Sequence, residues 1–188
     1  SWHGITVTHK DWPGKVAAQI NLEGQGHIDG EVEIEISREL NAWAEKIVEA
    51  NPSLSPRGHE IYSPVSSWTD SFPFATAGVP TMTVSSSGEV YAGRYHSSYD
   101  VRELIDWKFF GQLNKLEFRI ARALDKGLLP YNLQDVADDI AETVDKNQLE
   151  ATGADATAVA AFVDDVAAFQ EAAAAYEADK ASIGAAQI

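Results

Sequence analysis

The most constraining feature of this 188-residue sequence is a change in its hydrophobic period near residue 101. Before that position, segments of alternating apolar residues are interleaved with helical patterns. After it, apolar residues recur only at spacings of three and four, which is typical of amphipathic helices. The first helix after the change ends at Gly127 and can lie on the sheet, so we count it with the strands. The sequence therefore predicts an α/β region over 1–126 and an all-α helical segment over 127–188.

Alternating or short apolar segments predict the strands of the α/β region. These segments are Lys15 to Leu22, Glu31 to Ile36 and Pro80 to Ser85, with a further short strand expected near Glu60 to Tyr62 in a loop over 52–69. Strands interleaved with helices indicate a mostly parallel sheet. Three full strands are too few for a complete domain, so we expect the first half of the sheet to lie outside this chain.

Capping and stop signals place the helices. We expect Ser37 to cap a helix that ends at Ala50, and a short helix over Phe72 to Ala77. The alternation of Glu31 to Ile36 indicates either a strand whose glutamates face solvent or the segment that leads into the next helix. Longer helical stripes cover Val101 to Leu124, which Gly127 ends, Leu133 to Val144, and Val159 to Tyr176.

Composition excludes several classes of partner and chemistry. The formal net charge of −15 opposes binding to nucleic acids and to anionic lipids. No apolar run approaches the roughly 20 residues of a membrane span, so we expect no such span. The chain has no cysteine, which excludes disulfides and cysteine-ligated zinc but indicates no compartment. The segment from Gly127 to the end holds 12 acidic and two basic side chains, typical of a solvated helical face.

Three places in the sequence could carry chemistry. Glu23 follows a predicted strand, at the sheet edge where open α/β sheets bind ligands. Asp70 precedes the short helix, and His96 stands beside Tyr95 in a long loop. Each also has an ordinary structural interpretation: a solvated strand end for Glu23, a helix cap for Asp70 and an exposed loop position for His96.

Other chemistries have little support in the sequence. The remaining histidines, His3, His9, His27 and His59, show no spacing typical of metal ligands. There is no Gly-x-Ser-x-Gly segment for a serine hydrolase. Gly24-Gln25-Gly26 lacks the rest of a phosphate-binding glycine loop.

Taken together and in this order, three segments resemble the zinc exopeptidases of the glutamate carboxypeptidase II, aminopeptidase and transferrin receptor kind. They are Asn21-Leu22-Glu23, Asp70 to Pro80, and Tyr95-His96-Ser97-Ser98-Tyr99-Asp100. The resemblance implies the C-terminal portion of a mixed α/β sheet of the phosphorylase/hydrolase-like kind. Leu129 to Val136 is similar to the family's C-terminal helical domain, which pairs two subunits, so the resemblance also implies a homodimer.

The same resemblance implies roles for individual residues. Glu23 would be a ligand of one zinc ion and His96 a ligand of a second, so two ions are expected in the complete parent protein. Tyr95 would be the catalytic residue that donates a hydrogen bond to the developing oxyanion. Asp70 would be structural, at the rim of the site, and the substrate of the parent would be a peptide.

The sequence also departs from the family pattern in residues that the zinc site needs. The family's upstream histidine, bridging aspartate and Glu-Glu pair are missing, and the slot of that pair falls at Ser1-Trp2. The resemblance therefore implies a fragment of a zinc-dependent exopeptidase, either aminopeptidase-like or carboxypeptidase-like. Alone it should be inactive and hold zinc weakly or not at all. The alternative, favoured by Ser1-Trp2, is a catalytically dead binding or assembly module that resembles the transferrin receptor. The retained Tyr95-His96 favours the first interpretation.

Overall fold

The computed structural model describes residues 2–86, 88–126 and 130–186. The chain divides into two compact units, one over 1–130 and the other over 131–188. Three residues used in the sequence predictions, Ser1, Gly127 and Leu129, lie outside the described residues. The first unit has a mixed α/β fold, which confirms the predicted fold class.

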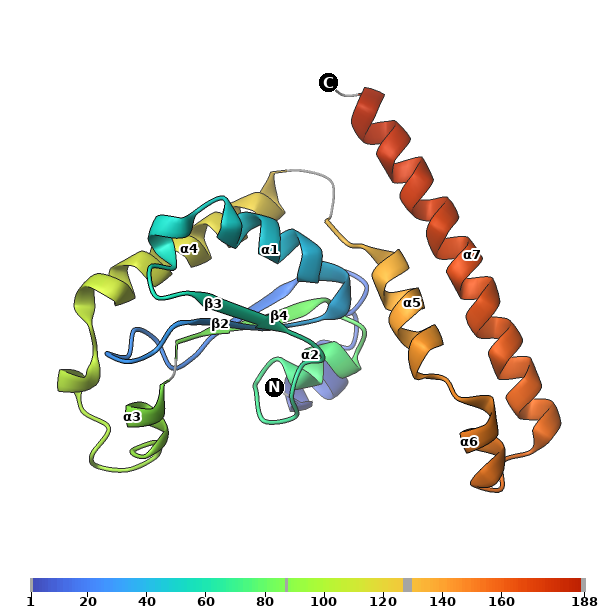
Figure 1. The fold of residues 1–188 in the computed structure, drawn as a ribbon, viewed down its shortest axis with the longest axis horizontal. Helices are drawn as coiled ribbons and strands as arrows, with labels where there is room; N and C mark the ends of the chain where they lie inside the picture. Colours follow the sequence, from blue (N-terminus) through green and yellow to red (C-terminus); the bar gives the residue numbers. More distant parts are fainter. Residues whose placement is uncertain (1, 87, 127–129, 187–188) are drawn as a thin grey trace. The chain divides into compact units, whose positions relative to one another are not determined.

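The centre of the α/β unit is a four-stranded sheet (Figure 1). Its strands lie in the order β1 (Gln19–Leu22), β4 (Thr81–Ser85), β2 (Val32–Ile36) and β3 (His59–Tyr62). β1 pairs parallel to β4 and β2 parallel to β3, whereas β2 and β4 are antiparallel. The sheet is therefore mixed, and the short strand expected near Glu60 to Tyr62 is present as β3.

The first strand is shorter than the alternation of its sequence predicts. β1 begins at Gln19 because the preceding backbone turns instead of extending. The N–H groups of Lys15 and Val16 both donate to the carbonyl of Trp12, at 2.8 and 2.9 Å. These donors are therefore used in a local turn and not in a strand ladder.

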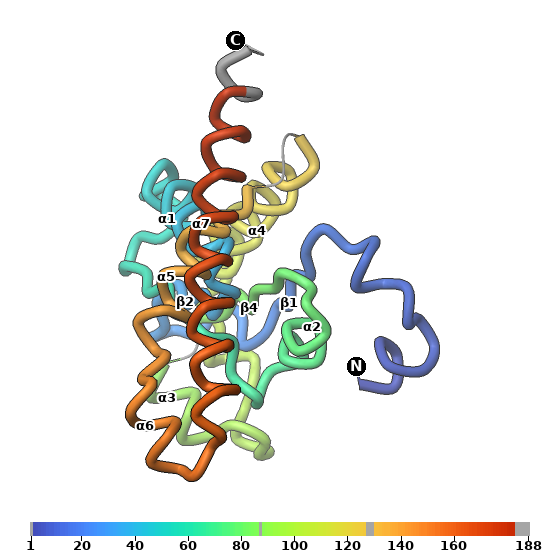
Figure 2. Tube along the Cα trace, turned by 90° about the vertical axis from the view of Figure 1, so that its right-hand side faces the viewer, coloured from blue at the N-terminus to red at the C-terminus, as the bar shows by residue number. Residues whose placement is uncertain are grey.

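An N-terminal segment precedes this turn and includes a π-helical turn over Gly4–Thr8, which the sequence did not predict. From the N-terminus, the segment starts beside α2 (Phe72–Thr76) and runs to the sheet at β1, as Figure 2 shows. The rings of Trp2 and Phe72 meet edge to face with centroids 6.2 Å apart. This aromatic contact anchors the segment to α2.

Helices α1 (Asn41–Glu49) and α4 (Trp107–Asp125) cover one face of the sheet, and α2 lies on the other (Figure 1). A 3-10 turn, Pro52–Leu54, packs against α4. The core consists of fully buried aliphatic side chains from the sheet and the two covering helices. They include Val32, Ile34, Ile36, Leu40, Ala44, Val48, Met82, Val84, Leu113, Leu116 and Ile120. The apolar stripe predicted for α4 therefore faces the sheet. That predicted for α1 does so only in part, because Leu40 and Ala44 are buried whereas Trp43 and Ile47 are half-buried.

Two of the predicted helix starts are wrong. Ser37 precedes a 3-10 turn, Arg38–Leu40, and α1 begins only at Asn41. The Ser37 hydroxyl instead accepts the backbone N–H of Thr81 at 2.9 Å, so it serves the junction with β4 and not a helix cap. The helix expected from Val101 is divided into a 3-10 turn, Arg102–Leu104, and α4, which Asp106 caps.

The second unit contains α5 (Leu133–Thr143), α6 (Lys146–Ala151) and α7 (Ala156–Ala186). α5 packs along α7, and the residues buried in this unit are Ala137, Val159, Val166 and Ala173. α6 was not predicted, because six residues carry too little periodicity to be recognised. None of the described helices combines the length and the apolar character that a membrane span requires.

Candidate active site

Glu23 lies at the edge of the sheet where the parallel strands β1 and β4 both end. Its backbone N–H donates to the carbonyl of Val84 at 3.1 Å, which extends the β1–β4 pairing by one residue. The side-chain amide of Asn21 donates to Glu23 Oε2 at 3.2 Å. These contacts hold the half-buried carboxylate at the carboxyl edge of the sheet, where ligands of open α/β folds bind.

A cavity of about 320 Å³ opens at this edge, and both Glu23 and Tyr95 line it. Its remaining lining residues are Gly24, Glu33, Glu35, Tyr62, Thr69, Thr83, Ser85, Tyr91 and Ala92. The cavity thus presents three carboxyl groups and three phenols, and no lysine or arginine is among the described residues that line it. Its electrostatic character therefore suits a cationic or metal-associated ligand group.

Glu33 and Glu35 enter the cavity from β2, which the sequence interpretation missed. They pair across the antiparallel ladder with Ser85 and Thr83, so they face the same side as the end of β4. Ser85 donates its hydroxyl to Glu33 Oε2 at 3.1 Å. Glu35 is only 7% exposed and accepts the backbone N–H of Ser66 at 2.5 Å. Glu33 and Glu35 are therefore cavity residues, whereas Glu31 is exposed as predicted.

The tyrosines of the cavity are also more numerous than predicted. Tyr91, on the short helix α3 (Glu89–Ala92), stacks on His27 at 3.8 Å and meets Tyr95 edge to face at 5.4 Å. Burial raises the pKa of Tyr91, and the charges of Asp100, Tyr95 and Glu23 raise it further. The Tyr91 phenol therefore stays a protonated donor at neutral pH.

Tyr62, at the end of β3, has the same behaviour for the same reasons. Burial raises its pKa first, followed by the negative charges of Glu35, Glu33 and Glu60. No sequence signal marks either tyrosine. Helix α3 ends at Ala92, so Tyr91 and Tyr95 do not share a helix, and the place of Tyr62 depends on strand pairing.

The other two predicted residues lie beside the cavity and do not line it. His96 is exposed, adopts a left-handed backbone with φ of 56°, and stacks on Tyr95 with ring centroids 3.7 Å apart. Asp70 is exposed next to Thr69, which lines the cavity. Asp70 does not cap α2 as predicted, because Ser71 occupies that position. The roles of these residues in a zinc site stay predictions.

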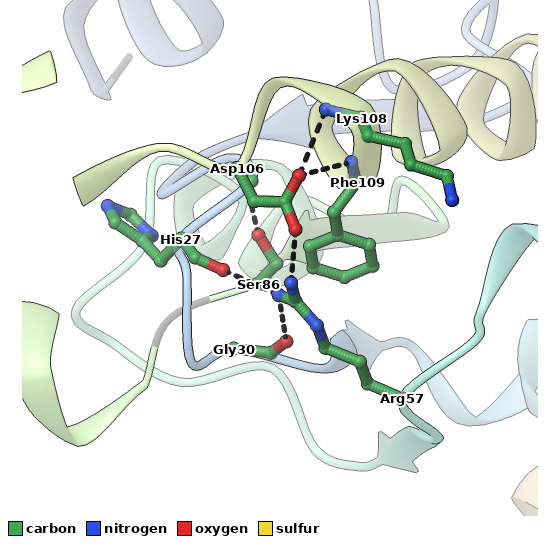
Figure 3. A network of polar contacts seen from close by, with 8 residues as sticks. His27, Gly30, Arg57, Ser86, Asp106, Lys108 and Phe109 are labelled. Carbon is green, nitrogen blue, oxygen red and sulfur yellow. Dashed lines mark hydrogen bonds and ion pairs between the residues drawn. The ribbon is translucent and has the colours of Figure 1, made fainter. Parts of the chain in front are cut away.

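The loop behind Glu23 is fixed by a network centred on Arg57 (Figure 3). Arg57 Nη1 donates to the carbonyls of His27 and Gly30 at 2.9 and 3.2 Å, and Nη2 pairs with Asp106. The same Asp106 carboxylate caps α4 by accepting the N–H groups of Lys108 and Phe109 at 3.0 and 3.1 Å. The network ties the loop over 24–30 to the start of α4.

A buried acid lies on the α4 side of this loop. The Gln25 side-chain amide donates to the carbonyls of Val84 and Glu23, at 2.7 and 3.3 Å. Burial raises the pKa of Glu117 to about 7, against a smaller lowering by a hydrogen bond with Gln25. Gln25 Oε1 and Glu117 Oε1 have no hydrogen-bond partner among the described residues. Because both oxygens are acceptors, a proton on Glu117 supplies the donor that this contact needs.

One comparison with known proteins, a scan against protein-family models, matches the part of the chain that holds the sheet and the cavity. The model of "Peptidase family M28" matches residues 2–121, which cover the whole sheet, the cavity and most of α4. Searches of curated proteins and of solved structures give no match. The family match includes Glu23, Asp70, Tyr95 and His96, the residues that carried the resemblance in the sequence. It spans well over half of the chain, and the protein therefore belongs to peptidase family M28.

Proposed function

We propose that this chain forms part of a zinc exopeptidase site and supplies the wall that receives the free α-amino group of a peptide. Its family membership supports a metallopeptidase domain, a kind of hydrolase. The finer assignment concerns which end of the peptide enters the cavity. That assignment rests on the charge of the cavity.

The acidic cavity is the single observation that carries this proposal. A peptide amine is cationic near neutral pH, whereas a peptide carboxylate is best bound by arginine or lysine. Glu23, Glu33 and Glu35 line the cavity, and no cationic side chain is among its described lining residues. The cavity therefore favours an aminopeptidase-like over a carboxypeptidase-like substrate. The Tyr95 phenol lines the same cavity, and we propose that it donates a hydrogen bond to a substrate oxygen.

The described residues do not fit a complete zinc centre. Zinc sites in proteins have three or four protein ligands. No group of three or more histidine, aspartate or glutamate side chains is arranged to hold a metal among the residues that the structure describes. We therefore propose that the two expected zinc ions need ligands from elsewhere in a longer parent chain, and that this chain alone is inactive.

A second candidate function follows from the same observation. If the parent also lacks the missing ligands, the domain is a catalytically dead peptidase-like module for binding or assembly. The exposed position of His96, outside the cavity lining, favours this alternative. The two candidates differ in whether Glu23 and His96 each serve as a zinc ligand.

Zinc calorimetry on the purified chain, with an aminoacyl substrate assay, tests the proposal. We expect weak zinc binding that Glu23→Ala or His96→Ala removes, and no turnover. His59→Ala is the matched control. His59 Nε2 lies 3.3 Å from Glu45 Oε1, and neither residue lines the cavity. Zinc-dependent turnover, or a tight stoichiometric site, would refute the claim of incompleteness. A zinc affinity that neither substitution changes would favour the catalytically dead module.

A further inference from the structure

A second hollow lies between α1, the 3-10 turn Pro52–Leu54 and α4. It has a volume of about 670 Å³ and belongs entirely to the α/β unit. Its apolar surface comes from Trp43, Ile47, Leu54, Phe118 and Ala123. Phe118 is 64% exposed, although α4 has a fully buried face of its own. An exposed aromatic surface of this kind is typical of an interaction site.

Cationic side chains surround this apolar surface. They are Lys46, Lys115, Arg119, Arg122 and Lys126, five of the 14 lysines and arginines in a chain with net charge −15. None of the five makes an ion pair with another described residue. No acidic residue is among the described residues that line the groove. The groove therefore suits an occupant with apolar and acidic groups together.

Such a surface exists on α7 of the same chain. One side of this helix carries, at spacings of three and four, Phe162, Asp165, Phe169, Ala172, Tyr176 and Asp179. Phe162 and Tyr176 are 47% and 42% exposed. The neighbouring side, with Val159, Val166 and Ala173, is the one that is buried in the helical unit. We call the first set the aromatic-acidic stripe.

We propose that the groove between α1 and α4 binds the aromatic-acidic stripe of α7 from a second copy of this chain. This is the helix-in-groove mode of recognition, in which side chains spaced by three and four residues anchor a helix. The groove residues on α4 and at its C-terminal cap run from 114 to 126, about 18 Å of helix. The aromatic groups of the stripe recur about every 10 Å, so two of them fit the groove at once.

Reciprocal binding gives a closed dimer. If each groove holds the other chain's α7, the two contacts are related by a two-fold axis and no surface remains for further growth. The resemblance to known exopeptidases implies pairing through the helical segments. The proposed dimer differs because the α/β unit supplies the receiving surface. It does not depend on peptidase activity.

Charge gives the proposal a distinctive salt dependence. The segment over 131–188 holds 12 acidic and two basic side chains, so pairing of two such segments with each other is repulsive and strengthens as salt screens it. Groove and stripe attract, so their pairing weakens as salt rises. Sedimentation velocity of the full chain at about 0.05 M and about 0.5 M salt separates the two cases. We expect a dimer at low salt that weakens about tenfold or more at high salt.

A charge exchange locates the contact. The pair Arg119→Glu and Arg122→Glu, or the pair Asp165→Lys and Asp179→Lys, should weaken the dimer about tenfold or more. An equimolar mixture of the two double variants should form a dimer again, which also shows that both are folded. Lys108→Glu makes the same kind of charge change on α4 outside the groove and should leave the dimer intact.

Several outcomes would overturn this inference. They are a chain that stays monomeric at low salt, a dimer that strengthens with salt, and a groove variant that dimerises like the wild type. A mixture of the two double variants that stays monomeric would also overturn it. Zinc binding by Glu23 and His96 is measured separately, so the failure of either proposal leaves the other open.

Discussion

The two hollows of the α/β unit have opposite charge. The cavity at the ends of β1 and β4 has three glutamates and no cation among its described lining residues. The groove between α1 and α4 has five cations and no acid among its own. The net charge of −15 therefore includes two hollows of opposite local charge. Overall charge limits the partners of a whole molecule, but the distribution of charge decides what each surface binds.

Helix α4 connects the two hollows. Its buried acid, Glu117, contacts Gln25 behind the cavity, while the adjacent Phe118 and Arg119 line the groove. Substitutions on the two sides of α4 should therefore have separable effects. Substitutions in the loop over 24–30 and on the buried side of α4 test whether that loop depends on α4.

The largest expected effect is that of Gly26→Ala in the loop behind Glu23. Gly26 has φ of 76°, and an added Cβ would lie 2.6 Å from Phe110 Cβ on α4. Left-handed strain and a clash with a helix together should cost about 4 kcal/mol of unfolding free energy. Urea denaturation followed by tryptophan fluorescence measures this loss.

Gly14→Ala is the control, because an added Cβ there meets nothing within 4 Å. If Gly26→Ala is as stable as Gly14→Ala, the loop is not held against α4.

A smaller effect, of about 2–3 kcal/mol, should follow from the titration of Glu117. Burial raises its folded-state pKa to about 7, above the usual glutamate value, so the folded state binds the proton more tightly. This stability is fully present below about pH 4.3 and is lost as pH rises through about 7. Glu117→Gln should remove this part of the pH dependence between those values.

Glu103→Gln is the matched control, because it makes the same chemical change at an exposed side chain beside Arg102. An identical pH profile for Glu117→Gln and the wild type would show that Glu117 is ionised and solvated in the folded protein.

The smallest of the three effects should come from Asp106→Ala, which should lower the melting temperature of the α/β unit by only a few degrees. The substitution removes the cap of α4 and the partner of Arg57, but both side chains are about one-third exposed and water replaces part of the interaction. Thermal unfolding monitored by circular dichroism measures this change. Asp145→Ala removes the equivalent cap of α6 and should leave the α/β unit unaffected. Equal effects of the two on that unit would mean that the Arg57 network does not support it.

Local patterns predicted much of the fold and only part of the site. The buried alternation Val32, Ile34 and Ile36 and the stripe of α4 depend on single segments, and both were predicted correctly. Glu33 and Glu35 were misread because their surroundings depend on the antiparallel pairing with β4. The start of β1 was wrong because a turn at Trp12 competes with extension.

Long-range contacts escaped prediction for the same reason. Arg57 and Asp106 are 49 positions apart, and no sequence motif links the two residues. Glu23 and Tyr95 were found through family resemblance, and the structure brings both to one cavity. The groove was not predicted, because the exposed Phe118 breaks no helical pattern.

The most direct test of the account is an NMR titration of the chain with an amino-acid amide and with its N-acetylated form. The first has a free cationic amine and the second does not. We predict that the free amine shifts resonances of Glu23, Tyr91 and Tyr95 at the cavity, that Glu23→Gln weakens this response, and that the acetylated form causes none. Equal responses to both ligands, or a response at the groove residues Phe118 and Arg119, would contradict the assignment of the acidic cavity to the amino end of a peptide.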